Sequence, residues 1–240
     1  MDSFPTAPDH AALFLDFDGT LVDIAGTPDS IQVPPALPAL LQRLSARLDG
    51  ALAVVSGRPL AQLDQHLPVP IAKVGDHGGA LRADPLGPVE GPPLPAPPTS
   101  WILRARGIAN AFPGAFIESK AHGFVLHYRQ APEAAGMARG LLEALVAEAP
   151  DIFTLMPARM AWEVKPRAVS KGTAVAALLA RAPFAGRVPI FIGDDVTDEA
   201  GMAAAVAAGG IGLRLQDAFG TPARLRDWLT QLADAPHGAA

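Results

Sequence analysis

The chain has 240 residues, of which 50% are apolar and 18% charged, and it contains no cysteine. The apolar content excludes a disordered chain, and the absence of cysteine excludes a disulfide framework and fits a cytoplasmic protein. With a net charge of −5 and no basic run interleaved with aromatic residues, nucleic acid is not expected as a partner.

No membrane contact is expected either. The longest stretch without a charged residue, 200–213, has fourteen residues, fewer than the ~17 to 25 apolar residues of a spanning helix. The first ten residues contain two acids and no lysine or arginine, so we find no export signal. We therefore expect a cytoplasmic protein, with a monomer as the working expectation because the sequence leaves the oligomeric state open.

Short apolar runs alternate with helical periods at both ends of the chain. This alternation is typical of strand–helix units on a parallel sheet. The predicted strands are 11–17, 51–55 and 188–192, and the predicted helices are 37–48, 171–181, 198–207 and 222–232. We expect both ends of the chain to form one α/β core.

The middle of the chain has a different pattern. Seven prolines between Pro85 and Pro98 predict a stiff connection. Beyond it we expect helices at 101–111 and 133–148 and strands at 115–120, 124–129, 152–156 and 160–165. The predicted domains are a core of residues 1–88 and 166–240 and a smaller α+β insert of residues 89–165.

The first candidate site is Asp16-Phe17-Asp18-Gly19-Thr20, directly after a buried strand. Ligands of open α/β sheets bind beyond the carboxyl ends of the strands. Two carboxylates so close together repel each other, and a divalent cation that prefers oxygen relieves that repulsion. The motif therefore indicates a Mg²⁺ site, although an acidic turn is the plainer alternative.

Two further motifs could hold an anion. Ser56-Gly57-Arg58 follows the second strand, and a hydroxyl, a glycine amide and a helix start together suit a phosphate. Taken alone, the motif is more typical of an ordinary turn. Lys171 lies at a predicted helix start, where a cation opposes the helix dipole and is unfavourable unless an anion is bound there. A solvated lysine is an equally good interpretation of this position.

The fourth motif runs from Gly193 to Glu199 and contains four acids, Asp194, Asp195, Asp198 and Glu199. Capping of a helix N-terminus explains at most Asp198 and Glu199. The remaining acids require a cation. The glycine cluster at 209–212 has no nucleotide-binding context, and we interpret it as a turn.

In this order the four motifs resemble those of the haloacid dehalogenase superfamily of phosphotransferases. The resemblance implies a Rossmann-like α/β core with a smaller α+β cap of the C2 type. It implies that Asp16 is a nucleophile forming an aspartyl-phosphate, and that Asp18 is the general acid and base. It further implies Mg²⁺ ligands at Asp16, Asp18 (through its carbonyl) and Asp194, with Asp195 and Asp198 in support, and phosphate contacts from Ser56, Gly57 and Lys171.

Strand periodicity in the insert separates apolar from charged side chains. Phe124, Leu126 and Tyr128 alternate with His127 and Arg129; Met160, Trp162 and Val164 alternate with Glu163 and Lys165; and Glu118 and Lys120 share a face. A plain solvated face is the simpler interpretation. A mixture of donors and acceptors also suits a ligand with many hydroxyl groups.

These positions, with the motif 75–79 around His77, resemble the trehalose-6-phosphate phosphatase family, and the resemblance covers about residues 13–232. It implies a sugar-phosphate substrate, the last step of trehalose biosynthesis, and substrate contacts from a set of charged and polar residues: Arg58, His77, Glu118, Lys120, His127, Arg129, Glu163 and Lys165. One departure is Ala80, where the family usually has an acid.

Three alternatives stay open at this stage. The enzyme could act on another sugar phosphate, such as sucrose phosphate or mannosylphosphoglycerate. It could be a phosphomutase that returns the phosphate to the sugar. It could also be a non-catalytic module that binds sugar phosphates, although such a module has no need of the complete set Asp16, Asp18, Ser56, Lys171 and Asp194.

Overall fold

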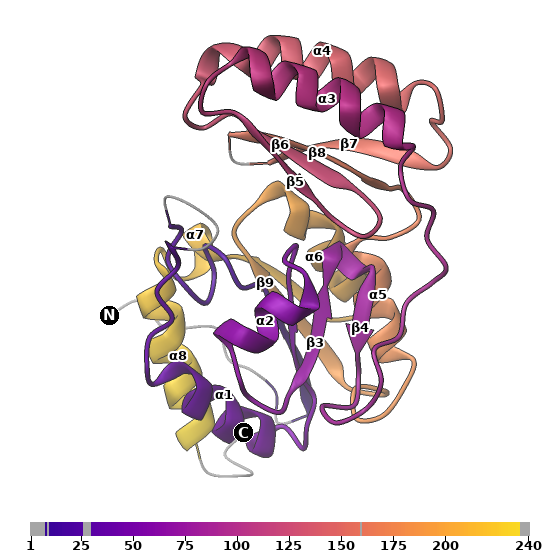
Figure 1. Ribbon diagram of the computed structural model, residues 1–240. Coiled ribbons are helices and arrows are strands. Elements are labelled where there is room, and N and C mark those ends of the chain that lie inside the picture. Colours follow the sequence, from indigo (N-terminus) through magenta and orange to yellow (C-terminus); the bar gives the residue numbers. More distant parts are fainter. Residues whose placement is uncertain (1–7, 9, 26–29, 159, 236–240) are drawn as a thin grey trace. The chain divides into compact units, whose positions relative to one another are not determined.

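Six short strands build the main sheet of the protein, which we describe from a computed structural model (Figure 1). The described residues are 8, 10–25, 30–158 and 160–235. Most of the N-terminal segment in which we find no export signal lies outside them. None of the helices in these ranges is long and apolar enough to cross a membrane.

The main sheet has the order β10-β9-β1-β2-β3-β4. Its strands are β1 (Ala11–Leu15), β2 (Leu52–Val55), β3 (Ala72–Gly75), β4 (Ala80–Arg82), β9 (Val188–Gly193) and β10 (Ile211–Arg214). All neighbours pair in parallel except β3 and β4, which are antiparallel. β1 and β2 are buried along their whole length, as expected for strands covered on both faces.

Helices cover both faces of this sheet. They are α1 (Leu37–Arg47), α2 (Leu60–His66), α5 (Lys171–Leu179), α6 (Glu199–Ala207), α7 (Leu215–Ala218) and α8 (Pro222–Asp234). The β1-α1-β2 and β9-α6-β10 crossovers run in opposite directions along the sheet, so right-handed connections place α1 and α6 on opposite faces. α8 packs beside α1, and α5 packs beside α6 (Figure 1).

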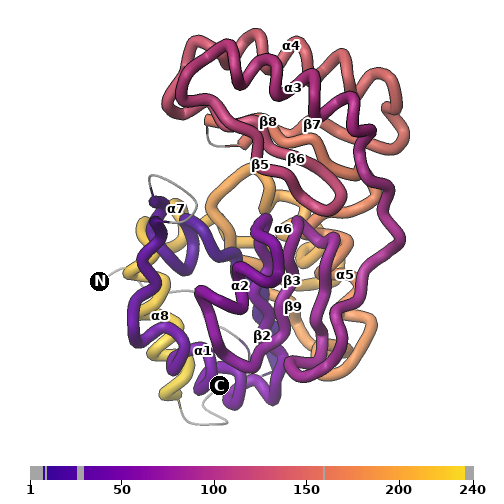
Figure 2. The backbone as a smooth tube through the Cα atoms, viewed as in Figure 1, coloured from indigo at the N-terminus to yellow at the C-terminus, as the bar shows by residue number. Residues whose placement is uncertain are grey.

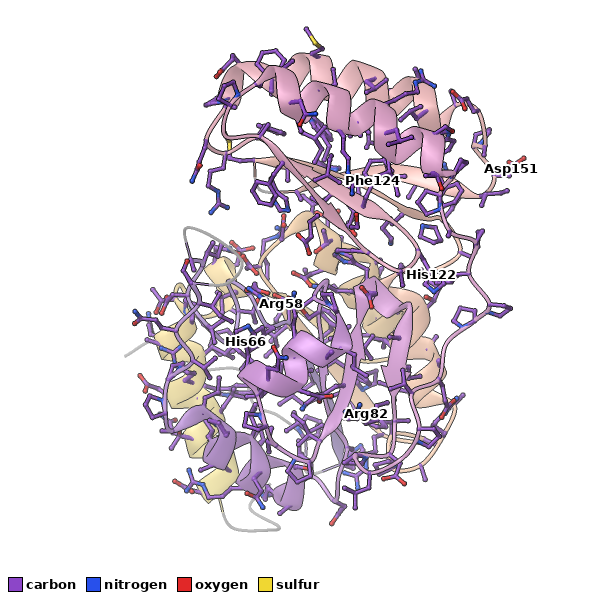
Figure 3. The ribbon with its side chains drawn as sticks, viewed as in Figure 1. Arg58, His66, Arg82, His122, Phe124 and Asp151 are labelled. Atoms are coloured by element: carbon purple, nitrogen blue, oxygen red, sulfur yellow. The ribbon has the colours of Figure 1, made fainter. Side chains whose placement is uncertain are left out.

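A second sheet has the order β5-β6-β8-β7 and is antiparallel. Its elements are α3 (Thr99–Ala111), β5 (Phe116–Ser119), β6 (Phe124–His127), α4 (Ala135–Val146), β7 (Phe153–Ala158) and β8 (Ala161–Pro166). α3 and α4 run side by side (Figure 2). They cover one face of the sheet, where Phe124 (labelled in Figure 3) lies. Phe124 belongs to the same buried cluster as Trp101 and Leu142.

The chain divides into two compact units, residues 1–91 with 169–240 and residues 92–168. The junctions predicted from the sequence lie at 88/89 and 165/166. The second junction falls later because β8 continues to Pro166 within the second sheet. The fold class is thus the expected one, an α/β unit with a parallel sheet and a smaller α+β unit.

Two local predictions were wrong. The glycine cluster 209–212 is not all turn, because Ile211 and Gly212 begin β10, an edge strand whose backbone pairs with β9. Met160 does not belong to the apolar layer of the second sheet. It precedes β8 with a φ of 54° and is 37% exposed, whereas Trp162 and Val164 do pack against the helices.

Candidate active site

Three acids converge at the carboxyl ends of the neighbouring strands β1 and β9. Asp16 follows β1, and its amide donates to the carbonyl of Ile192 in β9 at 2.9 Å. Asp194 follows β9, and Asp198 lies four residues further along. Each of the three offers one carboxylate oxygen, and these oxygens lie within 4.8 Å of one another. A set of carboxylate oxygens matches the preference of hard divalent cations, so the cluster could hold such a metal ion.

Lys171, the first residue of α5, lies against this cluster. Its Nζ donates to Asp16 Oδ1 at 2.6 Å and to Asp198 Oδ1 at 2.5 Å, and its side chain is 2% exposed. Burial alone would lower the pKa of Lys171, but the Asp16 and Asp198 carboxylates outweigh it and hold the pKa above its ordinary value. Lys171 is therefore charged, and carboxylates offset its unfavourable place at a helix start.

The acids themselves carry more negative charge than one lysine balances. Burial raises the pKa of Asp16 well above its usual value, and the Asp198 carboxylate raises it further, against the opposing effect of Lys171. Burial also raises the pKa of Asp194, and repulsion from Asp198 adds to this. Both carboxyls therefore bind a proton more readily than free aspartate does, as expected of groups that a cation would stabilise.

Asp198 and Asp195 have different surroundings. Asp198 is fully buried, and its Oδ2 accepts hydrogen bonds from the amides of Asp194 and Asp195, each at 3.0 Å. It thus ties the loop after β9 to Lys171. Asp195 is exposed, and its carboxylate caps a short 3₁₀ turn by accepting from the amide of Val196. It lies outside the group of three acids that could hold a metal.

Thr20 has a part that the sequence analysis did not assign. It is fully buried, and its hydroxyl donates to Asp194 Oδ1 at 3.0 Å. The hydroxyl therefore fixes the orientation of a carboxylate 174 positions away in the chain. The only signal in the sequence was the place of Thr20 at the end of the first acidic motif.

Asp18 is paired rather than free. Arg58 donates from Nε and Nη2 to the two carboxylate oxygens of Asp18, both at 2.7 Å. The guanidinium also lies over the ring of Phe17, 5.9 Å from its centroid. Arg58 precedes α2, and His66 lies at the other end of that helix (Figure 3). The side chain that we expected to contact substrate thus holds the expected general acid.

The remaining expected residues of this unit form the loop after β2 and the turn after β3. Ser56 is buried, and its hydroxyl oxygen accepts a hydrogen bond from the amide of Arg58 at 3.1 Å. Gly57 lies between them. His77 is buried in the turn Asp76–Gly78. The first unit therefore brings together Asp16, Asp18, Ser56, Gly57, Arg58, His77, Lys171, Asp194, Asp195 and Asp198 near the carboxyl ends of its strands.

The other six expected residues lie in the second unit, and four of them pair across strands. Glu118 accepts from His127 Nε2 at 2.8 Å, and Lys120 donates to Glu163 at 2.8 Å with both side chains at most 10% exposed. Arg129 follows β6, and Lys165 is buried in β8. These four side chains are therefore paired with one another and are not freely solvated. Phe116, which the sequence analysis left out, stacks on the His127 ring with centroids 4.5 Å apart.

The parallel sheet with acids at the ends of β1 and β9, together with a second α+β unit, has the fold of haloacid dehalogenase-like proteins. The profile of the trehalose-phosphatase family matches residues 14–207. A protein named "Probable trehalose-phosphate phosphatase" from Sinorhizobium fredii is 42% identical over 90% of this chain and 81% of its own length. The chain belongs to the trehalose-phosphatase family.

Two further comparisons agree with this assignment. Trehalose-6-phosphate phosphatase of Escherichia coli is 38% identical over 94% of this chain and 82% of its own length. The solved C-terminal domain of the Candida albicans trehalose-6-phosphate phosphatase superposes with a TM-score of 0.75, at 20% identity, over 95% of this chain and 93% of that one. At that identity the structural likeness bears on the fold alone.

Proposed function

We propose that the protein hydrolyses trehalose 6-phosphate to trehalose and inorganic phosphate. The observation that carries the proposal is the group formed by buried Asp16, Asp198 and Lys171 with half-buried Asp194 at the carboxyl edge of the parallel sheet, in a chain of the trehalose-phosphatase family. Relatives at 38% and 42% identity are named for this substrate. The proposal extends their named activity to this chain.

In the proposed reaction, Asp16 attacks the phosphorus of the ester. An Asp16 oxygen forms a bond to phosphorus as the bond to the sugar oxygen breaks, and Asp18 in its acid form gives its proton to that leaving oxygen. A water molecule then attacks the aspartyl-phosphate, Asp18 takes the proton of that water, and phosphate leaves with Asp16 restored. Arg58 must release Asp18, or share it, before this proton transfer.

The residues that would hold the phosphoryl group are Ser56, Gly57 and Lys171. Phosphoryl transfer passes through a loose transition state, so the protein mainly supplies position and opposite charge. Asp16, Asp194 and the carbonyl of Asp18 would hold Mg²⁺, with Asp198 orienting the loop. The bound ion would neutralise charge on the phosphoryl oxygens. The donor set fits this ion because all of its ligands are oxygens.

We further propose that the second unit is a cap that binds the sugar part of the substrate. Its polar sheet face combines Glu118, Lys120, His127, Glu163 and Lys165, and the pairing of strands in the sheet sets the side-chain contacts there. A substrate with many hydroxyl groups needs such a mixture of donors and acceptors. Binding energy from the non-reacting part of a substrate can then position the reacting part.

The test is a panel of phosphate esters with Mg²⁺, scored by phosphate release and by product analysis. Trehalose 6-phosphate should be the preferred ester, and the product should be free trehalose, not a rearranged sugar phosphate. Asp16→Asn should abolish turnover, and Asp18→Asn should lose about 10²- to 10⁴-fold. Equal, mild losses in the two variants would contradict the roles, and a preference for another sugar phosphate would replace the substrate.

A further inference from the structure

A strained turn follows β3 in the first unit. Asp76 and His77 both have left-handed backbone conformations, with φ of 50° and 53°, and Gly78 follows with φ of 107°. Residues with a side chain rarely adopt this conformation, and two in succession persist only where the surroundings hold them. Such strain is found mainly at functional sites, so we asked what the turn holds.

The main chain of the turn is bonded to the loop Ser56-Gly57-Arg58. The amide of Asp76 donates to the carbonyl of Arg58 at 2.9 Å, and the amide of His77 donates to the carbonyl of Ser56 at 3.0 Å. One step earlier, the amide of Ser56 donates to the carbonyl of Val74 in β3 at 2.9 Å. Both ends of the loop are therefore fixed to β3 and its turn.

The His77 side chain lies against the middle of that loop. It is 8% exposed. A Cβ added to Gly57 would lie 2.4 Å from both Cε1 and Nε2 of the His77 ring, well inside contact distance. The ring thus occupies the space where any other residue at position 57 would place its side chain. Gly57 and His77 fit together as one packed pair.

The far side of the turn touches the start of α5. A Cβ on Gly78 would lie 2.4 Å from the carbonyl oxygen of Ser170. Ser170 is the N-cap residue of α5, and Lys171 is the first residue of that helix. The turn therefore contacts both elements that carry the proposed phosphoryl-binding groups.

We propose that His77 is a positioning residue for the phosphoryl-binding loop and does not contact the sugar. Its ring and its left-handed backbone hold Ser56 and Gly57 at a fixed place relative to Lys171. This inference rests on the proposed function in one respect, the assignment of Ser56, Gly57 and Lys171 to the phosphoryl group. Its consequence is that loss of the ring affects every phosphate ester alike, and also inorganic phosphate.

The first experiment compares His77→Asn with the matched control His66→Asn. Asparagine tolerates the left-handed conformation but has no ring, and His66 lies at the end of α2 outside the site. Calorimetry measures the affinity for inorganic phosphate with Mg²⁺, and kinetics give kcat/KM for trehalose 6-phosphate and p-nitrophenyl phosphate. All three should fall by a similar factor, about 10- to 100-fold, in His77→Asn, with no change in His66→Asn. A loss confined to trehalose 6-phosphate would make His77 a sugar contact, and no loss would also overturn the proposal.

The second experiment is a double-mutant cycle between Gly57→Ala and His77→Gly. Gly57→Ala alone should weaken phosphate binding because the new methyl group meets the ring. In the His77→Gly background the same change should add less than about a twofold loss, since the ring is gone. If Gly57→Ala alone does not fold, His77→Gly should restore folding to the double variant. If the two substitutions reduce phosphate affinity by independent factors that multiply in the double variant, Gly57 and His77 do not act as a packed pair. A double variant that also fails to fold would contradict the proposal too.

Phosphate affinity tests the role of His77, and cleavage of trehalose 6-phosphate tests the proposed function, so the two can fail separately. A native protein that binds inorganic phosphate yet does not cleave trehalose 6-phosphate would contradict the proposed function. The His77 test would still give an answer from phosphate affinity alone.

Discussion

Two isosteric substitutions in the acidic cluster should change stability in opposite directions. Asp198→Asn removes an acceptor either from Lys171 or from the amides of Asp194 and Asp195. An amide side chain has only one acceptor atom, so its NH₂ group must face donors on one side. Lys171 and Asp198 are 2% and 0% exposed, and breaking a buried pair costs about 3 to 5 kcal/mol. We expect about 3 kcal/mol of destabilisation, because Lys171 keeps Asp16.

Asp194→Asn should have the opposite effect in the metal-free protein. The Thr20 hydroxyl can still donate to the remaining amide oxygen, so this hydrogen bond is kept. Two carboxylates whose oxygens lie within 4.8 Å of each other repel by about 3.5 kcal/mol at an effective dielectric constant of about 20. The gain is smaller than this, because the raised pKa of Asp194 lets the native cluster take up a proton.

The assay is urea unfolding at neutral pH in the presence of a chelator, followed by the same measurement with Mg²⁺. Asp198→Asn should lower the unfolding free energy, and Asp194→Asn should leave it unchanged or raise it. Added Mg²⁺ should stabilise the native protein through binding linkage and stabilise Asp194→Asn much less. If Asp194→Asn destabilises the metal-free protein as much as Asp198→Asn does, the cluster is not held under repulsion and our reasoning is wrong.

Two further predictions concern hydrogen-bonded side-chain pairs away from the acidic cluster. Asp64→Asn should lower the unfolding free energy by about 1.5 to 3 kcal/mol. The reason is that the buried Lys73 loses the carboxylate 2.8 Å from its Nζ and keeps the Leu67 carbonyl as an acceptor. An unchanged urea midpoint would contradict this prediction. The hydrogen bond from His127 is the main cause that holds the pKa of Glu118 below its usual 4.5. Its stabilisation is therefore present above that value and is lost as pH falls through the lower folded-state pKa. The native protein should exceed Glu118→Gln in unfolding free energy at pH 7 and lose that advantage under acid, and a constant difference would contradict the assignment.

The position of the site at the carboxyl edge of the parallel sheet could be predicted from the sequence, because the end of a strand is marked by neighbouring residues in the chain. Asp16, Ser56 and Asp194 each follow a short apolar run, and the carboxyl ends of parallel strands meet at one edge. Order along the chain was therefore enough to place these residues in one site. The strands β3, β4 and β10 were not predicted, since strands of three or four residues carry too little periodicity.

The partners of each side chain could not be predicted in the same way. Asp195 and Asp198 are three residues apart, yet one caps a turn at the surface and the other is buried against Lys171. Spacing does not reveal which carboxylate folds back onto the amides. The pair Lys120 and Glu163 depends on the register between strands, which is fixed by contacts distant in the chain.

The negative charge of the acidic cluster makes the binding of phosphate depend on the binding of the metal ion. Among the described residues, three carboxylates face one ammonium group, so the fully ionised cluster is an unfavourable place for a phosphate dianion. A bound divalent cation would cancel this excess, and a phosphoryl group could then approach Lys171 and the Ser56 loop. On this reasoning the proposed Mg²⁺ is needed for binding phosphate as well as for the reaction. Chelation should accordingly abolish the binding of inorganic phosphate, which calorimetry can measure without any turnover.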